Sequence, residues 1–254
     1  MLVIVPLGLT LLPFSARWWF AFAVPGVISP WLSRGAVSIT LASIYLAGTL
    51  VLIALAVRDF LQHKRLRPRE IALYTALATP SIAALALVAE RSSYELFGFN
   101  LTVLSLTVAH FHFAGFAAAL IAFLVAGPRT TAGDAAAISV PLGTGIVLLG
   151  FFVGDPVELA GAAVLTAGMW LVGWNLWRRA RQADRTTGVL LTISAAVLVA
   201  TMLLALSWAL GHVVATPYLP LEWMVATHGL ANAVGFALCG LLAWRRLGTT
   251  EGAG

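Results

Sequence analysis

Residues 101–126 read LTVLSLTVAHFHFAGFAAALIAFLVA, a stretch without Lys, Arg, Asp or Glu. A helix needs about 20 predominantly apolar residues to cross the hydrocarbon core of a bilayer, and this stretch meets that length. It therefore predicts a membrane-spanning helix. Two histidines, His110 and His112, lie well inside the apolar run.

The remainder of the chain has the same character. Of its 254 residues, 61% are hydrophobic and 10% are charged, whereas a typical soluble domain has roughly 25% charged residues. The net charge of +5 does not indicate a nucleic-acid partner, because no soluble segment is left to present a basic surface. We predict an all-α protein, a polytopic transmembrane helical bundle of seven to eight spans with no soluble domain, forming a single transmembrane domain over residues 1–254.

Seven clear spans are predicted between residues 36 and 244 from apolar runs of sufficient length. They are Ala36–Val57, Ile71–Ala89, Leu101–Ala126, Ala135–Val153, Val157–Trp177, Val189–Leu210 and Trp223–Trp244. Residues 1–30 are also apolar, but Pro6, Pro13, Arg17, Pro25 and Pro30 interrupt them. Because proline breaks helices, we expect one broken span there, or a re-entrant segment with a short helix.

The basic residues predict the orientation. Most of the 15 Lys and Arg residues fall after the first, third, fifth and seventh of these spans. Loops rich in Lys and Arg stay in the cytoplasm. This pattern predicts a cytoplasmic C-terminus and, with eight spans, a cytoplasmic N-terminus.

His110 lies nine residues after Leu101, which corresponds to a depth of roughly 14 Å, near the bilayer centre. Ionisable groups at that depth often mark function. Residues two apart on a regular helix point about 200° away from each other. Either His110 and His112 line a cavity that wraps around the helix, or only one of them belongs to the site.

A second polar group lies in the last span. His228 and Asn232 are four residues apart, and hence on one helix face, where they would form a hydrogen-bonding wall for a polar ligand. Thr227 and Trp223, in the same segment, are candidates for substrate binding together with Asn232. Glu222 would lie above His228 if the helix extends that far back.

Acidic residues gather on the side opposite the basic loops. Glu90, Asp155, Glu158 and Glu222 are candidates for the rim of an outward-facing cavity with the three histidines at its base. Burial would raise the pKa of such a carboxyl and let it donate a proton. Two further residues are candidates for substrate binding, Asn100 and Arg17, although Asn100 at a span start also fits a helix cap.

Simpler interpretations stay open. His110 and His112 fit satisfied core histidines, and His228 with Asn232 fits a clasp between helices. No cofactor is predicted, but His110, His112 and His228 with a carboxylate also fit a metal site, and a bis-histidine haem would use the same residues. No HExxH motif supports the metal.

The segment His110–Phe116, followed by Trp223-Met224, Thr227-His228-Gly229 and Asn232 with Gly235-Phe236, resembles the YndJ-like family of bacterial integral membrane proteins. The likeness runs from the second span to the end of the chain. It implies a bacterial cytoplasmic membrane and supports the pairing of the two polar groups. Members of that family are often labelled transporters.

Three functions follow as hypotheses. The first is a membrane enzyme that performs acid–base chemistry, of isomerase or cyclase type, on a lipophilic small molecule. The second is a proton-coupled small-molecule transporter of the YndJ-like type. The third is a structural or sensory membrane protein. The expected partners are the lipid bilayer and that small molecule; the oligomeric state is left open.

Overall fold

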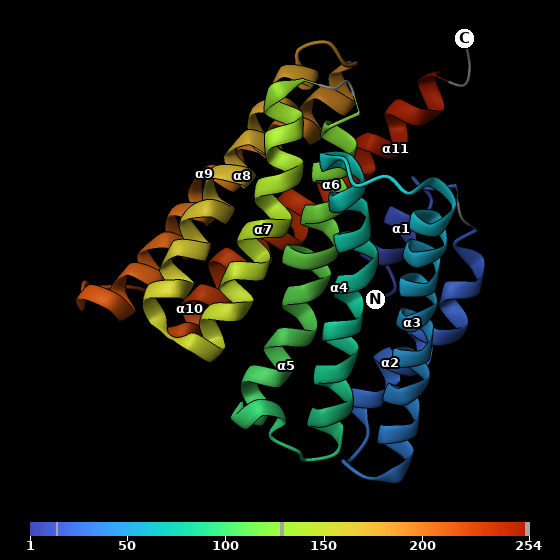
Figure 1. The fold of residues 1–254 in the computed structure, drawn as a ribbon, viewed down its shortest axis with the longest axis vertical. Helices are drawn as coiled ribbons and strands as arrows, with labels where there is room; N and C mark the ends of the chain where they lie inside the picture. The colour runs from blue at the N-terminus through green and yellow to red at the C-terminus, as the bar shows by residue number, and fades with distance from the viewer. Residues whose placement is uncertain (14, 128–129, 252–254) are drawn as a thin grey trace. The chain divides into compact units, whose positions relative to one another are not determined.

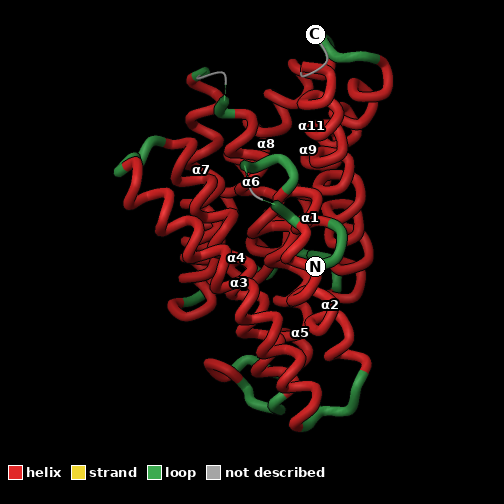
Figure 2. The backbone as a smooth tube through the Cα atoms, turned by 90° about the vertical axis from the view of Figure 1, so that its right-hand side faces the viewer, coloured by secondary structure: helices red, strands yellow, loops and turns green. Residues whose placement is uncertain are grey.

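The computed structural model describes residues 1–13, 15–127 and 130–251, and the regular structure within them is helical (Figures 1 and 2). Seven helices or helical runs are long and apolar enough to cross a membrane. They are Ala36–His63, Pro68–Arg91, Leu101–Val125, Thr131–Val153, Asp155–Ala180, Arg185–Val214 and Leu221–Gly248. The seven predicted spans are thus confirmed, and the chain is a multi-pass membrane protein.

Several helices extend beyond the predicted ends of the spans. Helix α3 has 28 residues, Ala36–His63, and is about 42 Å long, whereas the hydrocarbon core is about 30 Å thick. Arg58, which follows the predicted end of the first clear span at Val57, therefore lies in the last turns of α3. His212, which follows the predicted end of the sixth span at Leu210, lies within α9, Arg185–Val214. Hydropathy predicts where the hydrocarbon ends, but the backbone hydrogen bonds continue each helix into the polar interface.

The chain divides into two compact units, of which the first comprises residues 1–65 and 73–117. Its N-terminal segment forms the short helices α1 (Ile4–Leu9) and α2 (Phe20–Ile28), and Pro6 and Pro25 lie inside them. Helix α1 packs against a π-helical segment of the third span, and α2 packs against α3. Unit 1 contains α1 (Ile4–Leu9), α2 (Phe20–Ile28), α3, most of α4 (Pro68–Arg91), α5 (Leu101–His110) and the π-helical segment Phe111–Ala117.

The second unit comprises residues 66–72 and 118–254. Within it α8 (Asp155–Ala180) packs between α7 (Thr131–Val153) and α9, and α11 (Cys239–Glu251) packs against α9 (Figure 1). Its helices are α6 (Ala118–Val125), α7 (Thr131–Val153), α8 (Asp155–Ala180), α9, α10 (Leu221–Met224), the π-helical segments Val225–Gly229 and Ala231–Leu238, and α11 (Cys239–Glu251).

Glycines set the close contact between α7 and α8. A Cβ atom on Gly143 would lie 2.5 Å from the backbone nitrogen of Leu165, and one on Gly161 would lie 2.4 Å from that of Val147. Gly150 likewise faces the backbone of Glu158. In a bilayer such small residues allow helices to approach closely and gain van der Waals contact. Gly154, with φ +136, makes the turn between these helices.

The π-helical segments coincide with the two histidine motifs. One begins at Phe111 within the His110–Phe116 motif, and the other two cover Val225–Leu238 with a single α-helical residue, Leu230, between them. A π-turn adds a residue per turn and rotates the helix face that follows it. Such turns are rare and occur frequently at functional sites.

Candidate functional site

In unit 1 the candidate site is a buried pair formed by His112 and Tyr45. His112 is 3% exposed and Tyr45 is fully buried. The hydroxyl oxygen of Tyr45, on α3, lies 2.5 Å from Nε2 of His112, and Nδ1 of His112 lies 2.6 Å from the carbonyl oxygen of Val108. The carbonyl can only accept, so Nδ1 carries the proton of the neutral imidazole. Nε2 is therefore the acceptor and the Tyr45 hydroxyl is the donor.

Aromatic packing holds this pair in place. The ring of Trp19 meets Tyr45 edge to face at 5.6 Å between centroids, and its indole nitrogen donates to the carbonyl oxygen of Met1 at 2.9 Å. Gly26 of α2 leaves room for the Tyr45 ring, because a Cβ there would lie 2.6 Å from Tyr45 Cγ. The N-terminal segment thus covers the phenol side of the pair.

His110 and His112 point to different surroundings. His110 is exposed and its ring contacts Phe111, whereas His112 is buried. Only His112 of the two therefore belongs to the buried pair with Tyr45. The π-turn begins at Phe111 and does not bring the two imidazoles onto one face.

Glu90 belongs to a second group in unit 1, a buried charge cluster at the end of α4. Its carboxylate accepts hydrogen bonds from Arg34, at 3.1 and 2.8 Å, and from both Nε and Nη2 of Arg91. Arg91 also donates to the carbonyl oxygens of residues 29, 30 and 32. Two guanidinium groups thus engage Glu90, and Arg91 ties the end of α4 to the chain that follows α2.

In unit 2, His228 and Asn232 share one helix face, as their spacing predicts, and both bind α9. Nδ1 of His228 donates to the carbonyl oxygen of Thr201 at 2.8 Å, so Nε2 accepts from the Asn232 amide at 3.2 Å. The Thr201 hydroxyl donates to the Asn232 side-chain oxygen at 3.0 Å. This ring of hydrogen bonds uses both nitrogens of the imidazole.

The neighbours of His228 in its motif face elsewhere. The hydroxyl of Thr227 donates to the carbonyl oxygen of Trp223 in its own helix at 2.6 Å, and Trp223 is 60% exposed. Glu222 and Asp155 are exposed at the starts of their helices, and Glu158 is half-buried on α8.

The remaining predicted residues lie at helix starts. Asn100 caps α5, because its side-chain oxygen accepts from the backbone N–H of Val103 at 3.0 Å. Arg17 is exposed and begins a short 3₁₀ turn. Within residues 1–13, 15–127 and 130–251, no three His, Cys, Asp or Glu side chains are grouped so as to hold a metal ion. Whether the two histidine groups line one cavity stays a prediction.

Sequence reasoning did not select three of the residues that complete these groups. Tyr45 was visible only as a polar residue at mid-span, and Thr201 resembles any hydroxyl residue of a membrane helix. Arg34 carried no signal that linked it to Glu90. The partners lie 67, 27 and 56 residues apart in sequence, and only helix packing brings them together.

Comparison with known proteins identifies the family. A family model described as YndJ-like protein matches residues 1–236. No curated protein and no solved structure matches the chain. The match includes both histidine motifs and covers most of the chain, and we conclude that the chain belongs to the YndJ-like family.

Proposed function

We propose that the protein is a membrane-embedded acid–base enzyme, of isomerase or cyclase type, acting on a lipophilic small molecule, with Tyr45 and His112 as the proton-exchanging pair. The observation that carries the proposal is the 2.5 Å contact between the phenol and Nε2 of an imidazole whose Nδ1 is held by a backbone carbonyl. A buried ionisable group in a membrane helix is costly, and such groups usually serve function.

The pair can complete a proton cycle without an external acid. Nε2 of His112 accepts a proton from one position of the substrate, and the Tyr45 hydroxyl gives its proton to another. The resulting imidazolium then returns a proton to the phenolate through their hydrogen bond. The substrate is rearranged, and both side chains regain their starting states.

Substrate access requires movement, since both side chains are buried. The N-terminal segment covers the pair through Trp19 and Gly26, so in the proposal this segment opens toward the lipid. Closure over a bound substrate would then exclude water from the reaction.

The proposal moves the acid role from the carboxylates to Tyr45. Both oxygens of Glu90 are occupied by guanidinium groups, which suits a structural anchor better than a proton donor. His228 is likewise assigned to fastening the last span to α9, because Asn232 and Thr201 engage both of its ring nitrogens.

Solvent deuterium incorporation tests this proposal without knowledge of the substrate. Membranes containing the protein are incubated in D₂O, and lipid extracts are compared by mass spectrometry. We expect at least one lipophilic species to gain deuterium with the wild-type protein, and not with Tyr45→Phe or His112→Gln. Tyr74→Phe is the matched control, since it removes a phenol that binds Asp59 instead. Labelling that persists in Tyr45→Phe and His112→Gln would rule out the pair.

A proton-coupled transporter is the second candidate, and one observation favours it. One of the points where the chain passes between the two compact units falls at Ala117–Ala118, inside the third span and directly after the π-helical segment that carries His112. Transporters commonly move one bundle against another. Proteoliposomes with a trapped pH dye distinguish the two: solute-dependent proton flux that His112→Gln abolishes, without deuterium labelling, would favour transport.

The cell location is also proposed. We place the protein in a bacterial cytoplasmic membrane with both termini in the cytoplasm. The support is the concentration of Arg and Lys in alternate connections.

A further inference from the structure

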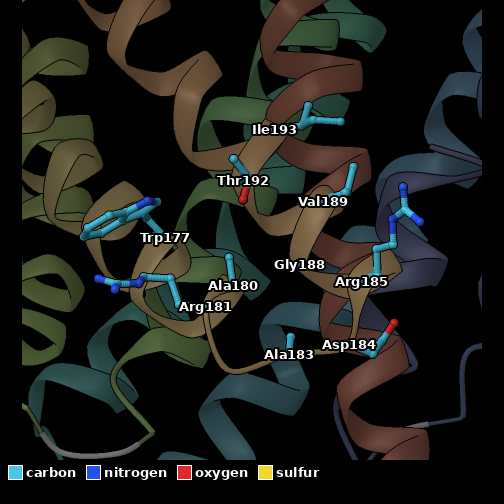
Figure 3. Close-up of a pocket in the computed structure, with 10 residues that line it drawn as sticks. All are labelled: Trp177, Ala180, Arg181, Ala183, Asp184, Arg185, Gly188, Val189, Thr192 and Ile193. Carbon is cyan, nitrogen blue, oxygen red and sulfur yellow. The ribbon is translucent and has the colours of Figure 1, made fainter.

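A groove lies at the turn between α8 and α9, within unit 2 (Figure 3). Its volume is about 360 Å³. Arg181 and Arg185 lie on opposite sides of it with their guanidinium groups pointing away from each other, and the Thr192 side chain lies between the two residues (Figure 3). Asp184 also lines the groove, together with the apolar side chains of Trp177, Val189 and Ile193.

The charge of this groove is positive. Asp184 is already engaged, because it caps α9 through the backbone N–H groups of Thr186 and Thr187, accepts from the Thr187 hydroxyl, and pairs with Arg246 at 3.6 Å. The hydrogen bonds from Thr187 hold the pKa of the Asp184 carboxyl below its usual value. In the described part of the chain, neither Arg181 nor Arg185 forms a salt bridge.

Exposed apolar side chains line the groove beside both arginines, with Trp177 near Arg181 and with Val189 and Ile193 on the side of Arg185 (Figure 3). Trp177 is 39% exposed, Val189 is 52% exposed and Ile193 is 41% exposed. These side chains lie on helices that cross the membrane, where exposed apolar surface faces lipid chains. The central guanidinium carbon of Arg181 lies over the Trp177 ring, 5.2 Å from the ring centroid, so charged and apolar side chains adjoin each other in the lining.

We propose that this groove binds an anionic phospholipid, with the phosphate group at the basic turn that carries Arg181 and Arg185 and an acyl chain along Val189 and Ile193. Arginine recognises phosphate through several N–H donors in a fixed plane. Basic pockets between membrane helices suit anionic lipid headgroups. A soluble phosphate would satisfy the arginines but would leave the apolar lining of the groove uncovered.

Native mass spectrometry of the full chain in detergent tests the proposal by titration with phosphatidylglycerol or phosphatidylcholine. We expect tighter binding of phosphatidylglycerol, and a loss of affinity of roughly fivefold for each arginine removed in Arg181→Gln and Arg185→Gln. The control variant Arg178→Gln with Arg245→Gln removes the same charge from exposed residues outside the groove and should leave the affinity unchanged.

Two outcomes would overturn the lipid site. An equal loss in the control variant would mean that only the general surface charge attracts the lipid. Competition by inorganic phosphate as strong as that by phosphatidylglycerol would mean that the groove takes a soluble anion. Circular dichroism of each variant verifies that the helices are intact, so a loss of affinity reports on the groove.

Discussion

His112 and His228 differ in the group that their Nε2 atom contacts. Nε2 of His112 faces a phenol, whereas Nε2 of His228 faces a carboxamide. A phenol can give up its proton and take it back, but an amide cannot do so near neutral pH. The contrast supports the assignment of proton exchange to His112 and of helix fastening to His228.

The fastening role of His228 predicts a specific pattern of stability. His228→Gln keeps a donor and an acceptor beside Thr201 and Asn232, so we expect almost unchanged thermal stability in detergent. His228→Leu removes two hydrogen bonds, and since interhelical bonds in membranes average about 0.6 kcal/mol, a loss of about 1 kcal/mol is expected. Both variants should keep the deuterium labelling of the wild type. Abolished labelling in His228→Gln would return His228 to the reaction.

The charge cluster around Glu90 predicts a larger loss of stability than the loss of the His228 hydrogen bonds. Glu90→Leu would leave Arg91 buried without its carboxylate, and breaking a buried ion pair by removing one partner costs about 3–5 kcal/mol. Because Arg34 is 46% exposed and reaches solvent, the lower end of that range is expected. Unfolding by a denaturing detergent measures the change. Glu95→Leu, at an exposed position of the following loop, should have little effect, and equal effects of the two variants would contradict the anchoring role.

At the level of the helices, two glycines of α7 allow a matched test of the packing of α7 on α8. Gly143→Ala would place a methyl group 2.5 Å from backbone atoms of α8, whereas Gly145→Ala meets nothing within 4 Å. We expect Gly143→Ala to cost about 1–3 kcal/mol through overpacking. Gly145→Ala should be neutral or stabilising by up to about 1 kcal/mol, because alanine favours the helix. Similar thermal stabilities of the two variants would show that α7 and α8 are free to separate.

Sequence reasoning placed the spans well and the site only in part, for a physical reason. A run such as Leu101–Val125 must be helical and buried in lipid once it exceeds the membrane thickness, so composition alone locates it. The pairing of His112 with Tyr45 depends on how helices pack, and small residues such as Gly26 set that packing without a periodic signal. The π-turn at Phe111 gives no sequence signal either, because hydropathy reports that a run is apolar and does not report which backbone hydrogen bonds the run forms.

At the scale of the whole molecule, the chain passes between the two units close to His112 of the proposed proton-exchanging pair. The chain passes between the units at three points, and one of them lies within the third span immediately after Phe111–Ala117. A motion between the units would therefore involve the helix that carries His112. A π-turn is a common place for a helix to bend. Either opening toward a lipophilic substrate or a transport cycle would use this point.

The orientation of the whole chain is testable with single cysteines, because Cys239 is the one native cysteine. In a Cys239→Ser background, Gln182→Cys labels the turn between α8 and α9, and Thr216→Cys labels the connection between α9 and α10; both positions are exposed. The arginines near the first turn should hold it in the cytoplasm. We expect a membrane-impermeant maleimide to modify Thr216→Cys in intact cells and Gln182→Cys only after permeabilisation. The reverse pattern would invert the orientation and place the arginine-lined groove on the outer surface.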